Sequence, residues 1–118
     1  MKKALLVFAV MGAFALASCS SSYDGKTASE LCMKCSNDSY SESDVNNLLK
    51  QYEACWKEIN RFAKKKAEGS LSDEENSKMN EYCYALNEME YVLAFKVARE
   101  YPDVENKVRD ITRKYKVD

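Results

Sequence analysis

The chain has 118 residues, of which 31% are charged and 46% are hydrophobic, and its net charge is −1. These values suit one small globular domain. The chain contains no histidine, which removes the commonest general base and the commonest metal ligand. A Ser-His-Asp or Cys-His catalytic arrangement is therefore excluded, and we expect no enzyme activity, no cofactor and no metal site.

The N-terminal segment has the pattern of a secretion signal. Lys2 and Lys3 form a basic start, and residues 4–17 are mostly apolar. A run of this length is too short to cross a bilayer comfortably as a helix, and its position at the start of the chain argues against a buried core helix. We expect residues 1–18 to be a signal peptide.

The apolar run ends in Leu16-Ala17-Ser18-Cys19, which is an aliphatic residue, two small residues and a cysteine. This motif resembles the lipobox of bacterial lipoproteins. The resemblance implies that the chain is cut before Cys19, that the Cys19 thiol carries a diacylglycerol, and that the new amino group is usually acylated as well. Two or three acyl chains would anchor the protein stably to a membrane.

By the same resemblance, the residue after the lipid-bearing cysteine indicates the destination. In this family, an aspartate at that position is associated with retention in the inner membrane, and this chain has Ser20 there instead. We therefore expect the protein to be in the outer membrane, facing the periplasm, with surface exposure as the alternative. Residues 19–26 would form a polar tether to a helical domain at 27–118. Without Lys2 and Lys3, 16 basic side chains face 19 acidic ones, and the net charge of −3 is not typical of nucleic-acid binding.

The first predicted helix is short. Residues 27–30, Thr-Ala-Ser-Glu, form a capping box, which is typical of a helix start. The segment that follows, as far as Cys35, is long enough for about two helical turns. We expect this helix to lie across the rest of the domain.

The next helix is long and has one broad apolar stripe. Residues 41–44 supply N-cap candidates and acidic side chains for its first turn. Apolar residues then recur at steps of three and four, as in a helix with one buried side. They are Val45, Leu48, Leu49, Tyr52, Cys55, Trp56, Ile59, Phe62 and Ala63. Three lysines at 64–66 close the helix, and Gly69 is expected in a left-handed turn.

A second long helix begins at Ser72 with the capping box S-x-x-E. Its stripe consists of Met79, Tyr82, Cys83, Leu86, Met89, Leu93, Val97 and Tyr101. Pro102 disfavours helix at the preceding residue. A narrower third stripe follows, with Val104, Val108, Ile111 and Tyr115.

These elements predict an all-α fold. Because the turn between the two long helices is short, they should lie antiparallel. We predict a small three-helix bundle built on this long antiparallel hairpin, with the short N-terminal helix laid across it. The alternative joins the last two helices into one kinked rod.

With Cys19 assigned to the lipid, an even number of cysteines is left, namely Cys32, Cys35, Cys55 and Cys83. Exported domains of this size commonly use cysteines in disulfides. Cys55 and Cys83 lie at nearly equal distances from the midpoint of the hairpin, so they should be level with each other. Either Cys55 pairs with Cys83 and Cys32 with Cys35, or each N-terminal cysteine bridges to one long helix. We expect disulfides to pin the short helix.

Residues 32–35, Cys-Met-Lys-Cys, also have the C-x-x-C spacing of thiol–disulfide exchange sites. Such sites use a helix N-terminus, whereas this motif falls at the end of its helix, and no strand of a thioredoxin-like fold precedes it. We therefore favour a structural role. A zinc site that adds Cys55 and Cys83 is weaker still, because a second C-x-x-C is missing.

The second long helix is apolar on two sides. Tyr84, Tyr91, Phe95 and Ala98 lie opposite its main stripe. Either the third helix or the segment at 32–35 covers these side chains, or they form a surface for a partner. We favour the first interpretation, with Phe95 in the core and the two tyrosines at a partly exposed rim.

These features predict a lipid-anchored cell-envelope protein without catalytic residues that serves as a protein-binding or structural module. One alternative is a periplasmic inhibitor or immunity protein, which needs the same compact scaffold. Another is a thiol–disulfide redox lipoprotein that uses Cys32 and Cys35. The expected partners are the membrane, through the lipid on Cys19, and an envelope protein, and nucleic acid is not expected.

Overall fold

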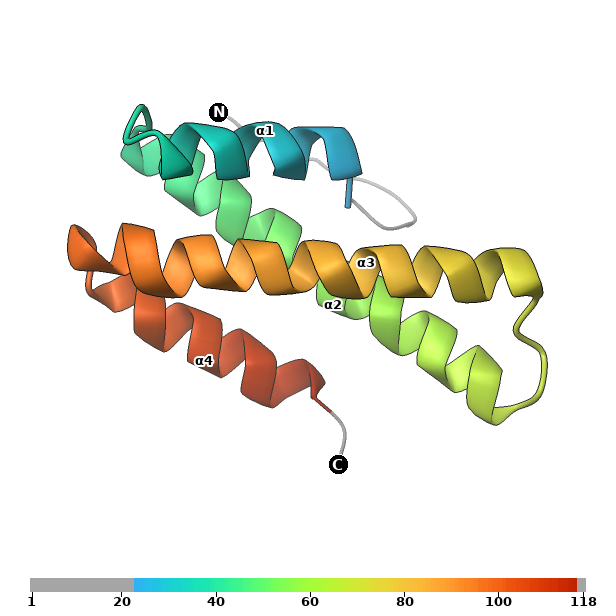
Figure 1. Cartoon of the computed structure of the whole chain (residues 1–118). Helices are drawn as coiled ribbons and strands as arrows, with labels where there is room; N and C mark the ends of the chain where they lie inside the picture. The colour runs from blue at the N-terminus through green and yellow to red at the C-terminus, as the bar shows by residue number, and fades with distance from the viewer. Residues whose placement is uncertain (1–22, 117–118) are drawn as a thin grey trace, which may run out of the picture.

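The computed structural model describes residues 23–116, and both the predicted signal peptide and Cys19 lie outside the described residues. The described part is mostly helical and contains no strand, which confirms the all-α prediction. Its four α-helices (Figure 1) are α1 Gly25–Ser36, α2 Glu42–Ala67, α3 Asp73–Tyr91 and α4 Asp103–Tyr115. A π-helical turn, η1 Val92–Lys96, and a 3₁₀ turn, η2 Val97–Arg99, connect α3 to α4.

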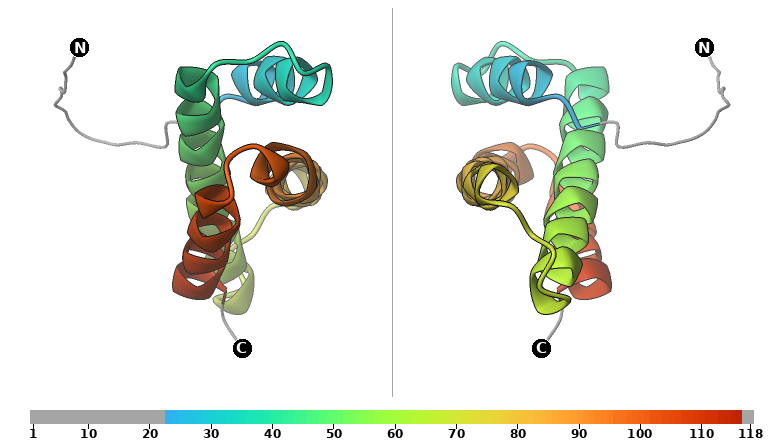
Figure 2. Two further views of the ribbon diagram at one scale, coloured as in Figure 1. Left: turned by 90° about the vertical axis from the view of Figure 1, so that its left-hand side faces the viewer. Right: turned by 90° about the vertical axis from the view of Figure 1, so that its right-hand side faces the viewer.

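The other helices all pack against α2. In Figure 1, α3 returns across α2 in the opposite direction and inclined to it, with α1 above and α4 below. Viewed along α3, α2 lies on one side of it, and no other described helix lies over the opposite side (Figure 2). The predicted three-helix bundle, with a short N-terminal helix laid across it, is confirmed.

Capping boxes begin both long helices. At the start of α2, the Ser41 hydroxyl accepts a hydrogen bond from Asp44 N (3.2 Å), and the Asp44 carboxylate accepts one from Ser41 N (3.0 Å). Ser72 and Glu75 make the same two bonds at the start of α3, both 3.1 Å long. Each box satisfies two backbone donors that have no partner within the helix. The predicted starts of both long helices are therefore confirmed.

α1 begins earlier than the sequence predicted. Its N-cap is Asp24, whose carboxylate accepts a hydrogen bond from Thr27 N (3.3 Å), so the predicted capping box at Thr27 does not start the helix. Aspartate is a favourable N-cap. Next to it, the Tyr23 ring packs edge-on against Tyr82 with the centroids 4.9 Å apart. The folded part thus begins inside the tether predicted at 19–26.

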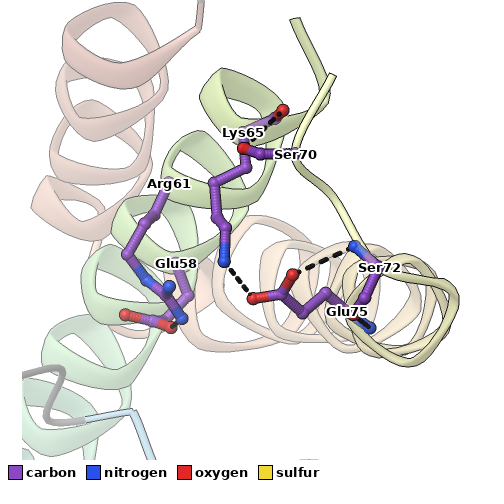
Figure 3. Close-up of polar contacts among 6 residues, drawn as sticks. All are labelled: Glu58, Arg61, Lys65, Ser70, Ser72 and Glu75. Carbon is purple, nitrogen blue, oxygen red and sulfur yellow. Dashed lines mark hydrogen bonds and ion pairs between the residues drawn. The ribbon is translucent and has the colours of Figure 1, made fainter. Parts of the chain in front are cut away.

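The connection between α2 and α3 is a tight polar turn (Figure 3). Gly69 has a φ of +76°, in the left-handed region that glycine adopts without steric cost, as predicted. Lys65 of α2 forms an ion pair with Glu75 of α3. The same carboxylate accepts the hydrogen bond from Ser72 N, so the ion pair connects the last turns of α2 directly to the cap of α3.

α3 does not continue as one rod into α4. The chain passes through η1 and η2, and α4 starts directly after Pro102. Proline disfavours helical conformation in the residue before it and lacks an N–H to donate. α4 then folds back on α2, where the Tyr52 and Thr112 hydroxyls share a hydrogen bond of 2.9 Å and Asn60 Nδ2 donates to the carbonyl of Tyr115 at 2.8 Å. The interpretation with separate helices is confirmed and the kinked rod is wrong.

The core collects the apolar stripes of all the elements, and every buried side chain in the described residues is hydrophobic. The predicted stripe of α2 is buried except for Trp56, which is half-buried, and Ala63, which is exposed. Val104 and Val108 of the predicted third stripe are buried as well. Among residues 23–116, no helix is both long and apolar enough to cross a membrane.

Candidate binding surface

The structure corrects the disulfide prediction. Cys32, Cys35, Cys55 and Cys83 are all free thiols, so no disulfide pins α1. The level arrangement on the hairpin does exist, because Cys55 Sγ donates a hydrogen bond to the carbonyl of Tyr82, 3.3 Å away. The Cys83 side chain, however, is exposed. Successive residues of a helix point about 100° apart, so a level backbone does not bring two thiols together.

The C-x-x-C thiols lie on the buried side of α1 and pack in the core. Burial raises the pKa of Cys32 to about 12, with a smaller effect from the nearby Glu88 carboxylate. Burial likewise raises the pKa of Cys35 to about 11, with an added effect of Asp44. Thiol–disulfide exchange requires a thiolate. The surroundings of both thiols therefore favour packing over redox chemistry.

We expect a thiol reagent to modify Cys83 in the folded protein and to reach Cys32, Cys35 and Cys55 only after unfolding. Burial excludes the reagent from these three thiols and raises the pKa of each one. Peptide mapping after N-ethylmaleimide treatment at neutral pH, with and without urea, measures this difference. The variant Cys83→Ser should lose the adduct of the folded state. Cysteines that stay unmodified in urea until a reductant is added would contradict the free thiols.

The second apolar side of α3 is exposed, contrary to the favoured interpretation. The exposed fractions are 79% for Tyr84, 60% for Tyr91 and 62% for Phe95. We call these three residues the aromatic face. α4 packs against α2, η1 and η2, and α1 packs along another side of α3 and η1, so neither covers this face. Phe95 is therefore a surface residue and the prediction of a core position is wrong.

The aromatic face is a stripe along one side of α3 and η1. The rings of Tyr91 and Phe95 lie against each other with centroids 5.4 Å apart and planes tilted by 37°. Tyr84 lies two helical turns before Tyr91, or about 10 Å along the axis. The opposite side of the same segment is anchored in the core by Leu86, Met89 and Leu93. A firmly held helix thus presents the aromatic rings to solvent.

The sequence patterns did not predict a role for the exposed charged and polar residues beside the aromatic face, which are Glu81, Glu88, Asn80 and Asn87. The signal that could have found them is a seven-residue spacing of like side chains on α3, which places them in rows along the helix. Met33 of α1 was not predicted at the surface either, although its side chain is 62% exposed. A methionine inside the C-x-x-C motif gave no reason to expect it at the surface.

Comparisons with protein-family models, with curated proteins and with solved structures found no match to this chain. The candidate site therefore depends on the geometry of its own residues. In residues 23–116, no three cysteine or carboxylate side chains gather closely enough to hold a metal ion. The aromatic face holds the three large aromatic side chains that are exposed in that part of the chain, and all three lie on the continuous segment of α3 and η1.

Proposed function

We propose that the protein is a lipid-anchored cell-envelope protein that binds a partner protein through the aromatic face. The exposure of Tyr84, Tyr91 and Phe95 on one side of the segment formed by α3 and η1 carries this proposal. Contiguous exposed apolar surface commonly marks an interaction site. Aromatic residues are enriched in protein interfaces and supply much of the binding energy.

The physical properties of the face suit a binding role. Tyrosine and phenylalanine offer large contact areas, and a tyrosine ring can pack while its hydroxyl stays in water. The core contacts of Leu86, Met89 and Leu93 hold the helix in place before any partner arrives. A preformed surface loses less conformational entropy on binding than a flexible one.

The lipobox motif supports the location of this binding. Only three residues separate Cys19 from Tyr23, and Tyr23 already packs on the fold. Four residues of extended chain span about 14 Å. A lipid on Cys19 would therefore keep the domain next to the membrane, and its partner would be a protein of the envelope. A periplasmic inhibitor or immunity protein would be one form of such a binder.

Site-specific photo-cross-linking tests this proposal. The full chain is produced in the cells that normally make it, with benzoylphenylalanine in place of Tyr84. In a separate strain, benzoylphenylalanine replaces the exposed Lys57 of α2. We expect a cross-link to one envelope protein from position 84 and not from position 57. Adding Tyr91→Ala should lower its yield about 30-fold or more, since truncation of a central aromatic costs about 2 kcal/mol or more.

The matched control is Met33→Ala, which removes an apolar side chain of similar exposure from α1. It should leave the cross-link unchanged, and thermal unfolding should show that the Tyr91→Ala variant keeps its fold. The proposal fails if Tyr91→Ala and Met33→Ala have equal effects, or if position 57 gives the same cross-link as position 84.

A further inference from the structure

An acidic row runs beside the aromatic face. Glu74, Glu81 and Glu88 follow one another at seven-residue steps on α3, and all three are exposed. Seven residues fall about 20° short of two full helical turns, so the three carboxylates lie nearly in line. Tyr84 and Tyr91 have the same spacing, and their row lies next to the acidic one.

An amide row lies on the other flank of the tyrosines. Asn80 and Asn87 are exposed and share the seven-residue spacing. The exposed side of α3 therefore has an aromatic centre, an acidic flank and a neutral polar flank. Parallel rows of this kind are the surface against which a second helix packs its own ridges.

None of the three glutamates of the acidic row forms an ion pair within residues 23–116, although Lys78 lies one helical turn from Glu74 and Glu81. α3 holds six acidic side chains and one basic side chain. Of these acids, only Glu75 forms an ion pair in residues 23–116, and its partner is Lys65. Glu74, Glu81 and Glu88 therefore offer their negative charge to whatever covers the aromatic face.

We propose that the aromatic face binds a basic amphipathic helix of a partner protein. This inference rests on the proposed function and specifies the chemistry of its partner. Apolar side chains of the partner helix would pack on Tyr84 and Tyr91, and its lysines or arginines would lie over the acidic row. Complementary charges beside an apolar seam also set the orientation and register of paired helices.

The same charges disfavour two other occupants. A second copy of this chain would bring two strongly acidic helices together, and like charges across an interface oppose association. An anionic membrane surface would be repelled for the same reason.

Phe95 lies seven residues after Glu88, so an aromatic ring ends the acidic row. The cationic residues of the partner should accordingly lie nearer the start of α3 than Phe95.

Charge reversal in the full chain tests this inference with the same cross-linker at Tyr84. Glu81→Lys combined with Glu88→Lys should lower the yield of the cross-link at least about ten-fold, since like charges would then face the partner. The matched control combines Glu30→Lys on α1 with Glu105→Lys on α4. Both glutamates are exposed, and this pair makes the same change in net charge away from the face. The control should keep the yield of the parent.

Mass spectrometry of the cross-linked peptide identifies the partner segment, which should be a net-positive helix with apolar residues at steps of three and four. Reversing two of its basic residues to glutamate should restore the cross-link to the Glu81→Lys, Glu88→Lys variant.

The remaining outcomes separate this inference from the proposed function. The inference is overturned if the cross-linked segment of the partner is neutral or acidic. It is also overturned if the cross-link survives charge reversal but is lost with Tyr91→Ala. Both outcomes leave the proposed function standing. A cross-link to a second copy of the chain or to lipid alone overturns both proposals. So does the absence of any cross-link from position 84.

Discussion

Leu93→Ala is expected to destabilise the fold by about 2–5 kcal/mol, whereas Phe95→Ala should change stability by no more than about 0.5 kcal/mol. The two residues lie two positions apart in η1. Leu93 is fully buried, and η1 packs against α1, α2 and α4. Truncating it removes apolar contacts and leaves a cavity at the junction of these elements. Phe95 is mostly exposed, so its removal leaves the core intact.

Urea unfolding followed by circular dichroism measures both variants against the parent. Since small domains have a total stability of about 5–15 kcal/mol, Leu93→Ala removes a large share of it. In a domain of this size, the loss corresponds to a fall in Tm of about 10 °C or more. Equal losses for the two variants would mean that Phe95 is packed inside the bundle, and the aromatic face would not be available to a partner.

Cys19→Ala is expected to abolish acylation completely. In the proposed anchor, the Cys19 thiol is the nucleophile that takes the lipid, and alanine offers no atom in its place. The variant should accumulate as an uncleaved or mislocalised precursor. Metabolic labelling with radioactive palmitate, followed by membrane fractionation, measures both effects.

The matched control for the anchor is Cys83→Ser, which removes an exposed thiol from α3 and should leave palmitate labelling unchanged. Labelling of Cys19→Ala at the level of the parent would contradict the anchor. It would leave the aromatic face untouched as a candidate site, because that face depends on the described residues alone.

The sequence by itself determined the helices and most of their ends. The apolar stripe of α2 has the helical period over several turns, and capping boxes at Ser41 and Ser72 mark where the long helices begin. These signals are local, since a cap and a glycine turn act on backbone atoms within a few residues. Pro102 acts locally in the same way and separates α4 from the helix before it.

The predicted start of α1 is wrong, because two N-cap candidates compete there. Both Asp24 and Thr27 are suitable N-caps, and the sequence alone does not rank them. The longer helix forms because Asp24 makes two hydrogen bonds. Its carboxylate accepts one from Thr27 N, which caps the helix. Its backbone N–H makes a second contact, to α2, by donating to Gln51 Oε1 at 2.8 Å. That second contact spans 27 residues of sequence and forms only when α1 lies on α2.

Only the tertiary structure decided which side of each helix is covered. The periodicity of α3 shows apolar residues on two sides, and it holds no information about where α1 and α4 come to rest. Leu93 and Phe95 look alike in such a pattern, yet one is buried and the other is mostly exposed. The same applies to Cys55 and Cys83, which the hairpin places level while Cys83 points to solvent. Burial and cysteine pairing depend on the direction of a side chain relative to elements far away in sequence, and the packing of the whole chain sets that direction.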